Sequence, residues 1–150
     1  MEDKLSIINK TKGKLPSLPF VSIKDDILGK DYSLSIAFVE KKKSHELNKK
    51  YRGKDRPTNV LSFTLTETKG ELVLCPSVIK SEMKDFGRNF EEFIGFLVIH
   101  GMLHLKGLEH SSTMERAEAK YDKKYFSRNR RGLTNDQSRG GRISKRGKNS

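Results

Sequence analysis

The stretch from Phe90 to Leu105 constrains the fold more than any other part of this 150-residue sequence. It is apolar on nearly all sides of a helix, which is typical of a helix buried at the centre of a domain. Asn89 can cap its first turn together with Glu92, and Gly107 suits the left-handed residue that follows a helix end. The sequence therefore predicts a central buried helix over residues 89–106.

Hydrophobic periodicity predicts the elements that pack around this helix. Strands are expected over residues 5–8, 33–39, 59–66 and 70–75, and further helices over 17–29, 43–52, 76–86 and a segment that opens at Ser112 with Met114, Ala117, Tyr121 and Tyr125 as its inner stripe. The last two strands are a short turn apart, which favours an antiparallel hairpin. The predicted fold class is α+β, with a small mixed four-stranded sheet covered by about five helices.

The charge of the chain is concentrated at one end. Thirty-one Lys and Arg against 19 Asp and Glu give a net charge of +12, and residues 127–150 alone carry eight basic residues and one acid. This segment has almost no apolar residues to bury, so we expect a single domain over 1–126 followed by a basic, disordered tail over 127–150. Such a surface suits nucleic acid or another polyanion.

Several classes of protein are disfavoured by composition. The longest apolar run, Phe93 to Ile99, has seven residues, far fewer than the roughly 20 that a membrane span needs. The first residues lack the apolar segment of a secretion signal, and the single cysteine, Cys75, excludes an internal disulfide framework. We therefore expect a cytoplasmic protein with no membrane partner.

Three of the four histidines fall within eleven residues. His100 and His104 are four apart on the predicted central helix, so they project from nearly the same face. Gly107 can take a positive φ where the helix stops, which lets His110 return toward the other two. Three neutral imidazoles with one open position are typical of a catalytic zinc site. The spacing predicts one Zn²⁺ per chain on His100, His104 and His110; the alternative is a structural cluster with separate hydrogen-bond partners.

The spacing His-x3-His-x2-Gly-x2-His resembles the zinc signature of metzincin proteases. Those proteases have a Glu directly after the first histidine as general base, whereas this chain has Gly101. Without that carboxylate, peptide hydrolysis has no proton acceptor in its usual place. The pattern thus predicts a metzincin-like zinc site but disfavours protease activity.

Two longer blocks carry a more specific resemblance. Residues 100–110 (HGMLHLKGLEH) and 46–63 (ELNKKYRGKDRPTNVLSF) resemble the two hallmarks of the YbeY-type family of bacterial metal-dependent endoribonucleases, the rRNA maturation factors. Segments 70–76 and 88–92 are also similar, and the likeness covers roughly residues 5–126. Glu109 and Asn59 each stand where the family usually has Asp. The first change keeps a carboxylate beside a predicted ligand, and the second removes a charge.

The resemblance implies a single-strand-specific endoribonuclease that acts in ribosomal RNA processing, at the 3′ end of the small-subunit RNA, and in ribosome quality control. It implies zinc on His100, His104 and His110, and a catalytic role for Arg52. Its partners would be single-stranded RNA, ribosomal RNA, and the ribosome or small-subunit proteins.

The chemistry of the individual residues is compatible with this activity. Zinc with three neutral ligands keeps its full charge and lowers the pKa of bound water toward about 7. Arg52 can present a planar fork of donors to a phosphate, and Lys54 and Arg56 suit contacts to the RNA backbone. Glu109 could orient a metal ligand. Each of these side chains has a plainer alternative as a solvated surface residue.

Two other functions stay open on the sequence alone. One is a zincin-like metalloprotease, and the other is a non-catalytic RNA-binding ribosome assembly factor in which zinc fastens the last helix. Two chemical alternatives also stay open: zinc-bound hydroxide or the RNA 2′-hydroxyl as nucleophile, and zinc or nickel, cobalt or copper as the metal.

Overall fold

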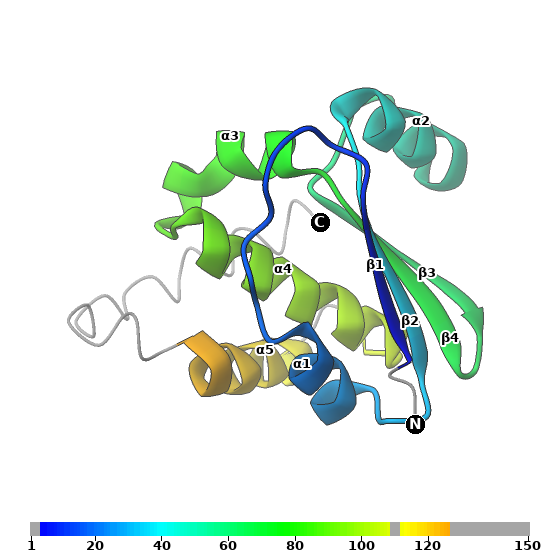
Figure 1. Cartoon of the computed structure of the whole chain (residues 1–150), viewed down its shortest axis with the longest axis vertical. Helices are drawn as coiled ribbons and strands as arrows, with labels where there is room; N and C mark the ends of the chain where they lie inside the picture. Colours follow the sequence, from blue (N-terminus) through cyan, green and yellow to red (C-terminus); the bar gives the residue numbers. More distant parts are fainter. Residues whose placement is uncertain (1–3, 109–111, 127–150) are drawn as a thin grey trace.

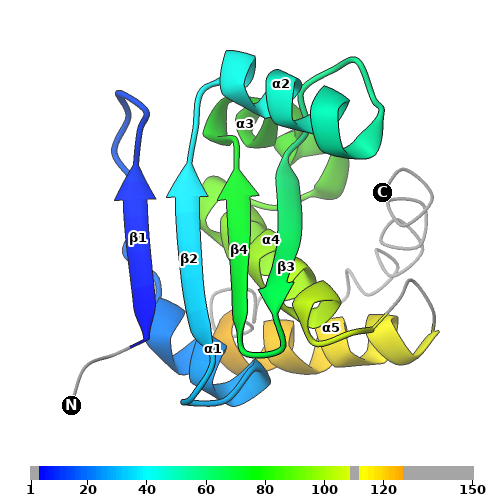
Figure 2. The same cartoon turned by 90° about the vertical axis from the view of Figure 1, so that its right-hand side faces the viewer.

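Four strands from the N-terminal half of the sequence form one mixed sheet in this computed structural model, which describes residues 4–108 and 112–126. The strands are β1 (Leu5–Asn9), β2 (Ser33–Phe38), β3 (Val60–Thr66) and β4 (Lys69–Leu74). They lie in the order β1-β2-β4-β3 (Figure 2). β1, β2 and β4 are parallel, while β3 is antiparallel to β4 and forms a hairpin with it. The expected mixed sheet and hairpin are thereby confirmed.

The helices lie on both faces of the sheet. They are α1 (Phe20–Ile27), α2 (Lys41–Arg52), α3 (Pro76–Phe86), α4 (Phe90–Leu105) and α5 (Ser112–Phe126). α1, α3, α4 and α5 cover one face, and α2 lies over one end of the other face (Figure 1). The α+β class is confirmed. α1 is shorter than the predicted 17–29, because Leu18 precedes Pro19 and is disfavoured in helical conformation.

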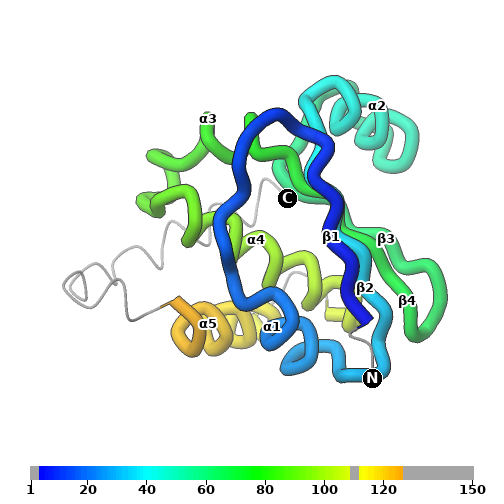
Figure 3. The backbone as a smooth tube through the Cα atoms, in the orientation of Figure 1, coloured from blue at the N-terminus to red at the C-terminus, as the bar shows by residue number. Residues whose placement is uncertain are grey.

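α4 is the central helix, as its composition predicts. The backbone trace in Figure 3 shows β1 leading through a long loop into α1, with α4 running through the helical layer. Every residue of α4 from Glu92 to Leu103 is buried. The Asn89 side chain accepts a hydrogen bond of 2.8 Å from the Glu92 backbone N–H, which confirms the predicted cap.

α5 buries the predicted face only in part. Its buried residues are Met114, Glu118, Asp122 and Phe126, whereas Ala117, Tyr121 and Tyr125 are only half-buried at the margin of the core. The predicted inner stripe is therefore confirmed at Met114, but the centre of the buried face consists of two acids instead of Ala117 and Tyr121. The Arg88 guanidinium forms an ion pair with Asp122, with 3.1 Å between Nη1 and Oδ1, and both side chains are 7% exposed. A paired carboxylate can be buried where an unpaired one cannot.

The remaining predictions about the whole chain concern its surface and its tail. Among the helices of the described residues, none has the length and apolar character to cross a bilayer. The basic segment 127–150 lies outside the described residues.

Candidate functional site

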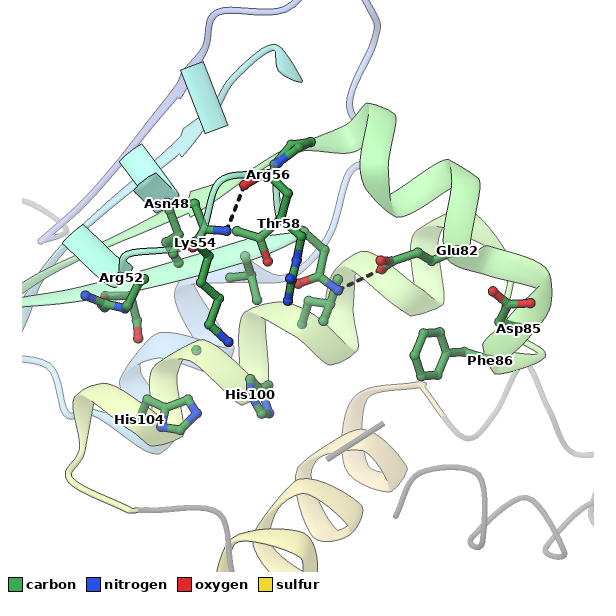
Figure 4. A pocket seen from close by; sticks show the side chains of 17 residues that line it. Asn48, Arg52, Lys54, Arg56, Thr58, Glu82, Asp85, Phe86, His100 and His104 are labelled. Carbon is green, nitrogen blue, oxygen red and sulfur yellow. Dashed lines mark hydrogen bonds between the residues drawn. The ribbon is translucent and has the colours of Figure 1, made fainter. Parts of the chain in front are cut away.

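A pocket of about 770 Å³ lies beside β3, between α2, α3 and α4 (Figure 4). Its lining residues are Asn48 and Arg52 of α2, Lys54, Arg56, Pro57, Thr58 and Asn59 of the following loop, Val60, Leu61 and Ser62 of β3, Glu82, Asp85 and Phe86 of α3, and Leu97, His100, Gly101 and His104 of α4. The fold thus brings both sequence blocks, 46–63 and the start of 100–110, to one place. The sequence alone predicts each block but not their meeting.

The two helical histidines lie one turn apart on the same side of α4. Their ring centroids are 4.7 Å apart, with the ring planes at 84°. His100 is buried and His104 is half-buried, and both line the pocket. Their shared face is the one that the i, i+4 spacing predicts.

His100 is held by a carboxylate of the last helix. Its Nδ1 hydrogen-bonds Glu118, and both side chains are almost fully buried. A carboxylate beside Nδ1 accepts a hydrogen bond from an Nδ1–H group, and in that neutral tautomer the lone pair of the ring is on Nε2. Carboxylate–histidine pairs of this kind fix the tautomer and the ring orientation of metal ligands. Glu118 is a functional candidate that the sequence analysis missed.

The end of α4 turns in the way that its glycine predicts. Gly107 has φ of +104°, its N–H donates to the His104 carbonyl at 2.9 Å, and the Leu108 N–H donates to the Leu103 carbonyl at 3.1 Å. These two bonds form the Schellman arrangement that reverses the chain after a helix. His110 and Glu109 lie outside the described residues, so their roles stay predictions.

The donors in the pocket suit a metal with an affinity for nitrogen. Imidazole is a ligand for zinc and for several neighbouring transition metals. Within residues 4–108 and 112–126, no three His, Cys, Asp or Glu side chains form a cluster able to hold an ion. His100 and His104 supply two of the three predicted ligands, and the orientation of His100 by Glu118 fits such a role.

Gly101 is a position in the pocket wall where α4 packs closely against the sheet. A Cβ added at this position would lie 2.6 Å from Leu72 Cδ2 of β4. The site where a metzincin places its catalytic Glu is therefore occupied here by a helix–sheet contact. This contact gives a packing reason for the departure that the sequence shows.

Arg52 forms the side of the pocket next to β3. Its guanidinium donates to the Ser62 carbonyl at 2.6 Å and to the Tyr51 carbonyl at 3.2 Å, and lies 5.1 Å from the centre of the Phe63 ring. The side chain is exposed and so remains accessible to solutes. These two hydrogen bonds to backbone carbonyls use part of the five N–H donors of Arg52 and fix the plane of its guanidinium group.

Lys54 and Arg56 belong to a loop that α2 anchors. Gly53 ends the helix with φ of +71°. The Asn48 side chain donates to the Arg56 carbonyl at 2.8 Å. In Figure 4 the Lys54 side chain extends from this loop toward His100 and His104. The structure therefore places both predicted phosphate-contact residues in the wall of the histidine pocket.

The wall opposite this loop is acidic. Asn59 donates to Glu82 Oε1 at 2.8 Å, and Asp85 lies nearby on α3 (Figure 4). Burial raises the pKa of Glu82, while the hydrogen bond from Asn59 opposes that shift. The Asn59 side chain is thus the partner of a pocket carboxylate, which its sequence position alone does not indicate.

The structure is that of a small α+β protein with a mixed four-stranded sheet and a buried central helix. Two histidines of that helix line its pocket. The fold is similar to the solution structure of TM1509 from Thermotoga maritima, with a TM-score of 0.61 and 28% identity. The similarity covers 85% of this chain and 93% of that chain.

The particular family follows from comparison with known sequences. The family model for Endoribonuclease YbeY matches residues 17–128, and the chain belongs to this family. Endoribonuclease YbeY of Lactobacillus helveticus is 40% identical over 111 residues, which are 61% of this chain and 64% of that protein. The Staphylococcus aureus (strain JH9) protein of the same name is 32% identical over 127 residues, 75% of this chain and 81% of that one. The resemblance found in the sequence is thereby confirmed.

Proposed function

We propose that this chain is a zinc-dependent endoribonuclease that cleaves single-stranded RNA and matures ribosomal RNA at the 3′ end of the small-subunit RNA. Family membership supports the class of reaction. The observation that carries the proposal is one pocket in which His100, oriented by Glu118, and His104 face cationic side chains of residues 52–56.

The metal would be held by His100, His104 and, from the predicted spacing, His110. When bound, zinc supplies positive charge that polarises a phosphoryl oxygen and lowers the pKa of coordinated water. Glu118 holds the His100 ring in the tautomer that such binding needs. Phosphodiester cleavage depends mainly on charge stabilisation and positioning, so Gly101 is less of an obstacle than in peptide hydrolysis.

The cationic wall supplies the positioning. Arg52, already fixed in plane by Ser62 and Tyr51, binds non-bridging phosphate oxygens of the scissile linkage. Lys54 neutralises charge on the same or the adjoining phosphate, and Arg56 binds the backbone further along. Glu82 and Asp85 stand on the other wall and repel phosphates from it. The phosphate is thereby directed toward the histidines.

The substrate and setting follow from the same features. A pocket of about 770 Å³ admits a nucleotide of an unstacked strand, whereas a duplex keeps its bases paired inside the helix. We propose ribosomal RNA in the cytoplasm as the substrate, with ribosome or small-subunit proteins as partners and ribosome quality control as a second role.

The structure bears differently on the two alternative functions, the metalloprotease and the non-catalytic assembly factor. A metalloprotease would need a base at residue 101, where a side chain meets Leu72. A non-catalytic RNA-binding assembly factor is favoured by the same basic charge that favours the nuclease. Cleavage of a bound RNA therefore separates the nuclease from the assembly factor.

The test uses the full chain, its measured metal content, and a labelled single-stranded RNA beside its duplex form. We expect stoichiometric zinc, cleavage of the single strand, and loss of cleavage when a chelator removes the metal. Arg52→Glu should lower the rate by about 100-fold or more while zinc content and fold persist. His104→Ala should lose metal and activity together.

Each possible outcome bears on the proposal. Zinc-loaded, folded protein that binds this RNA without cutting it would establish the assembly factor instead. An unchanged cleavage rate in Arg52→Glu would remove Arg52 from the mechanism. A substrate with one 2′-deoxy sugar at the cut identifies the nucleophile, because it stays cleavable only if water attacks.

A further inference from the structure

Tyr51 is the one large exposed aromatic side chain in the part of the chain that the structure describes. It is 51% exposed at the end of α2, and it belongs to neither apolar core cluster. The other large exposed apolar residues of that part are Ile7, Ile8 and Leu65. Burying a tyrosine ring would be favourable, so an exposed one at this place requires an explanation.

The ring is supported from behind and flanked by charge. Tyr51 meets Phe63 of β3 edge-on, with centroids 5.3 Å apart, and the Lys50 ammonium lies 5.2 Å from the Tyr51 ring centre. Phe63 in turn packs on the small cluster of Val39, Leu61 and Val73. The Tyr51 ring is therefore backed by the sheet while about half of it stays accessible.

The surface is continuous with the candidate site. The Arg52 guanidinium lies 5.1 Å from the centre of the Phe63 ring, and Arg52 also lines the histidine pocket. Tyr51 and Arg52 are adjacent in sequence, and the Arg52 side chain donates to the Tyr51 carbonyl at 3.2 Å. Tyr51 and Arg52 therefore lie against the same Phe63 ring, and Tyr51 is beside the part of the pocket wall that Arg52 forms.

The charge around this ring selects the kind of partner. Residues 41–56 contain eight Lys and Arg and two Asp and Glu. This excess fits a polyanion and disfavours an ordinary apolar protein interface, whose centre is depleted in charge. Aromatic rings beside a basic groove are how proteins bind the bases of single-stranded nucleic acid without reading their sequence.

We propose that Tyr51, backed by Phe63, stacks on one nucleobase of single-stranded RNA adjacent to the phosphate held in the pocket, while Lys50 and Arg52 bind the flanking phosphates. This inference rests on the proposed function and adds to it a base subsite. The subsite accepts any base because every base has a π-face. A duplex is excluded from it because its bases are stacked on one another.

The experiment measures binding and base environment in one set of RNAs. Single-stranded oligonucleotides carry either an abasic residue or 2-aminopurine at successive positions around the cut, and they are titrated with the full chain carrying His104→Ala so that they stay intact. Tyr51→Leu keeps an apolar side chain without a ring, and Tyr51→Phe keeps the ring. Ile8→Ala, at the opposite edge of the sheet and 50% exposed, is the matched control.

We expect Tyr51→Leu to weaken binding by about 5- to 100-fold, and Tyr51→Phe and Ile8→Ala to change it less than about twofold. One 2-aminopurine position should be quenched by the Tyr51 protein and not by Tyr51→Leu. An abasic residue at that same position should weaken binding to the Tyr51 protein and have no effect on Tyr51→Leu.

Three results would overturn the inference. Equal binding with and without Tyr51→Leu on the His104→Ala background, together with normal cleavage by Tyr51→Leu when His104 is intact, would leave the proposed function standing without this subsite. Loss of binding that is the same at every abasic position would indicate a general effect rather than stacking. A protein that is dimeric by sedimentation and becomes monomeric in Tyr51→Leu would assign the ring to contact between copies. A chain with His104 intact that neither binds nor cuts RNA would contradict the proposed function itself.

Discussion

His100, a candidate metal ligand, is oriented by its hydrogen bond with Glu118, which lies 18 residues further along the chain. The Glu118 side chain is not among the residues that line the pocket. Its effect acts through the ring, since it decides which nitrogen carries the proton and where the other nitrogen points. Glu118 is therefore a positioning residue.

Glu118→Gln should preserve the fold and weaken zinc binding by about 10- to 100-fold. The amide is a similar size but is a weaker acceptor for the Nδ1 proton, so the ring is held less firmly. Zinc affinity is measured by competition with a chromophoric chelator, which is independent of RNA cleavage. Glu115→Gln, on the exposed side of the same helix, should leave the affinity unchanged. Equal affinities in the two variants would show that the carboxylate is only structural.

Asn59 and Glu82 give a second prediction at the residue scale. The raised pKa of Glu82 means that the folded chain binds this proton more tightly than the unfolded chain, so stability is lost as pH rises through the folded pKa. Asn59→Asp replaces the 2.8 Å amide donor with a second carboxyl group. Two adjoining carboxylates resist double ionisation, which raises the folded pKa of the pair further.

Asn59→Asp should therefore match the parent chain at about pH 4 and be less stable by about 1 kcal/mol at about pH 8. Solvent screening keeps this figure small, because Glu82 is half-buried. Urea unfolding across this pH range measures the difference. The double variant Asn59→Asp with Glu82→Gln restores one donor and one acceptor, and should remove the loss of stability at high pH. A loss of stability that is the same at both pH values would contradict the shared proton.

At the scale of elements, the contact between α4 and β4 limits the size of the side chain that residue 101 can have in the pocket wall. Gly101 permits α4 to approach Leu72 so closely that the missing Cβ has no room. The same helix carries His100 and His104, so the depth of the histidines in the pocket depends on this approach.

Gly101→Ala should destabilise the fold by about 1–3 kcal/mol through overpacking. Helix propensity alone predicts the opposite change, since alanine stabilises a helix interior by about 1 kcal/mol relative to glycine. Urea unfolding measures the change, and Gly13→Ala is the control because its added Cβ meets nothing within 4 Å. Adding Leu72→Val, which shortens the side chain that is met, should recover part of the loss. A Gly101→Ala variant as stable as its parent would show that Leu72 moves aside at little cost.

The elements themselves were largely predictable because their signals are local. The cap at Asn89, the positive φ of Gly107 and the alternation of β2 each depend on residues within a few positions. The burial of Glu118 and Asp122 was not predictable, because their partners His100 and Arg88 are 18 and 34 residues away. An acid on an inner helical face is distinguishable from an exposed acid only when its partner in space is known. The location of the three-histidine zinc site stays a prediction for the same reason, since it needs the position of His110.

At the scale of the whole molecule, charge and core occupy different parts of the sequence. The described core residues run from Phe20 to Phe126, and residues 129–150 contain seven basic residues and one acid. These residues also lie beyond the segment 17–128 that the family model matches. Stability and RNA attraction should therefore be separable by truncation.

A chain ending at residue 128 should keep the unfolding midpoint of the full chain and lose affinity for single-stranded RNA at low salt. Its net charge falls from +12 to +6. A plot of log Kd against log salt should become shallower by up to about 5, at about 0.7 for each lost phosphate contact. Fluorescence anisotropy between low and physiological salt measures both slopes. Identical slopes would mean that the basic segment does not touch RNA.

The carboxylate that orients the first histidine is carried by the final helix, whereas the histidine itself is made 18 residues earlier. Translation proceeds from the N-terminus, so a nascent polypeptide acquires the imidazoles before it acquires the group that aligns them. A product that is interrupted before residue 118 lacks the hydrogen-bond partner of His100 Nδ1. The alignment of the His100 ring is thus among the last features of the site that synthesis completes.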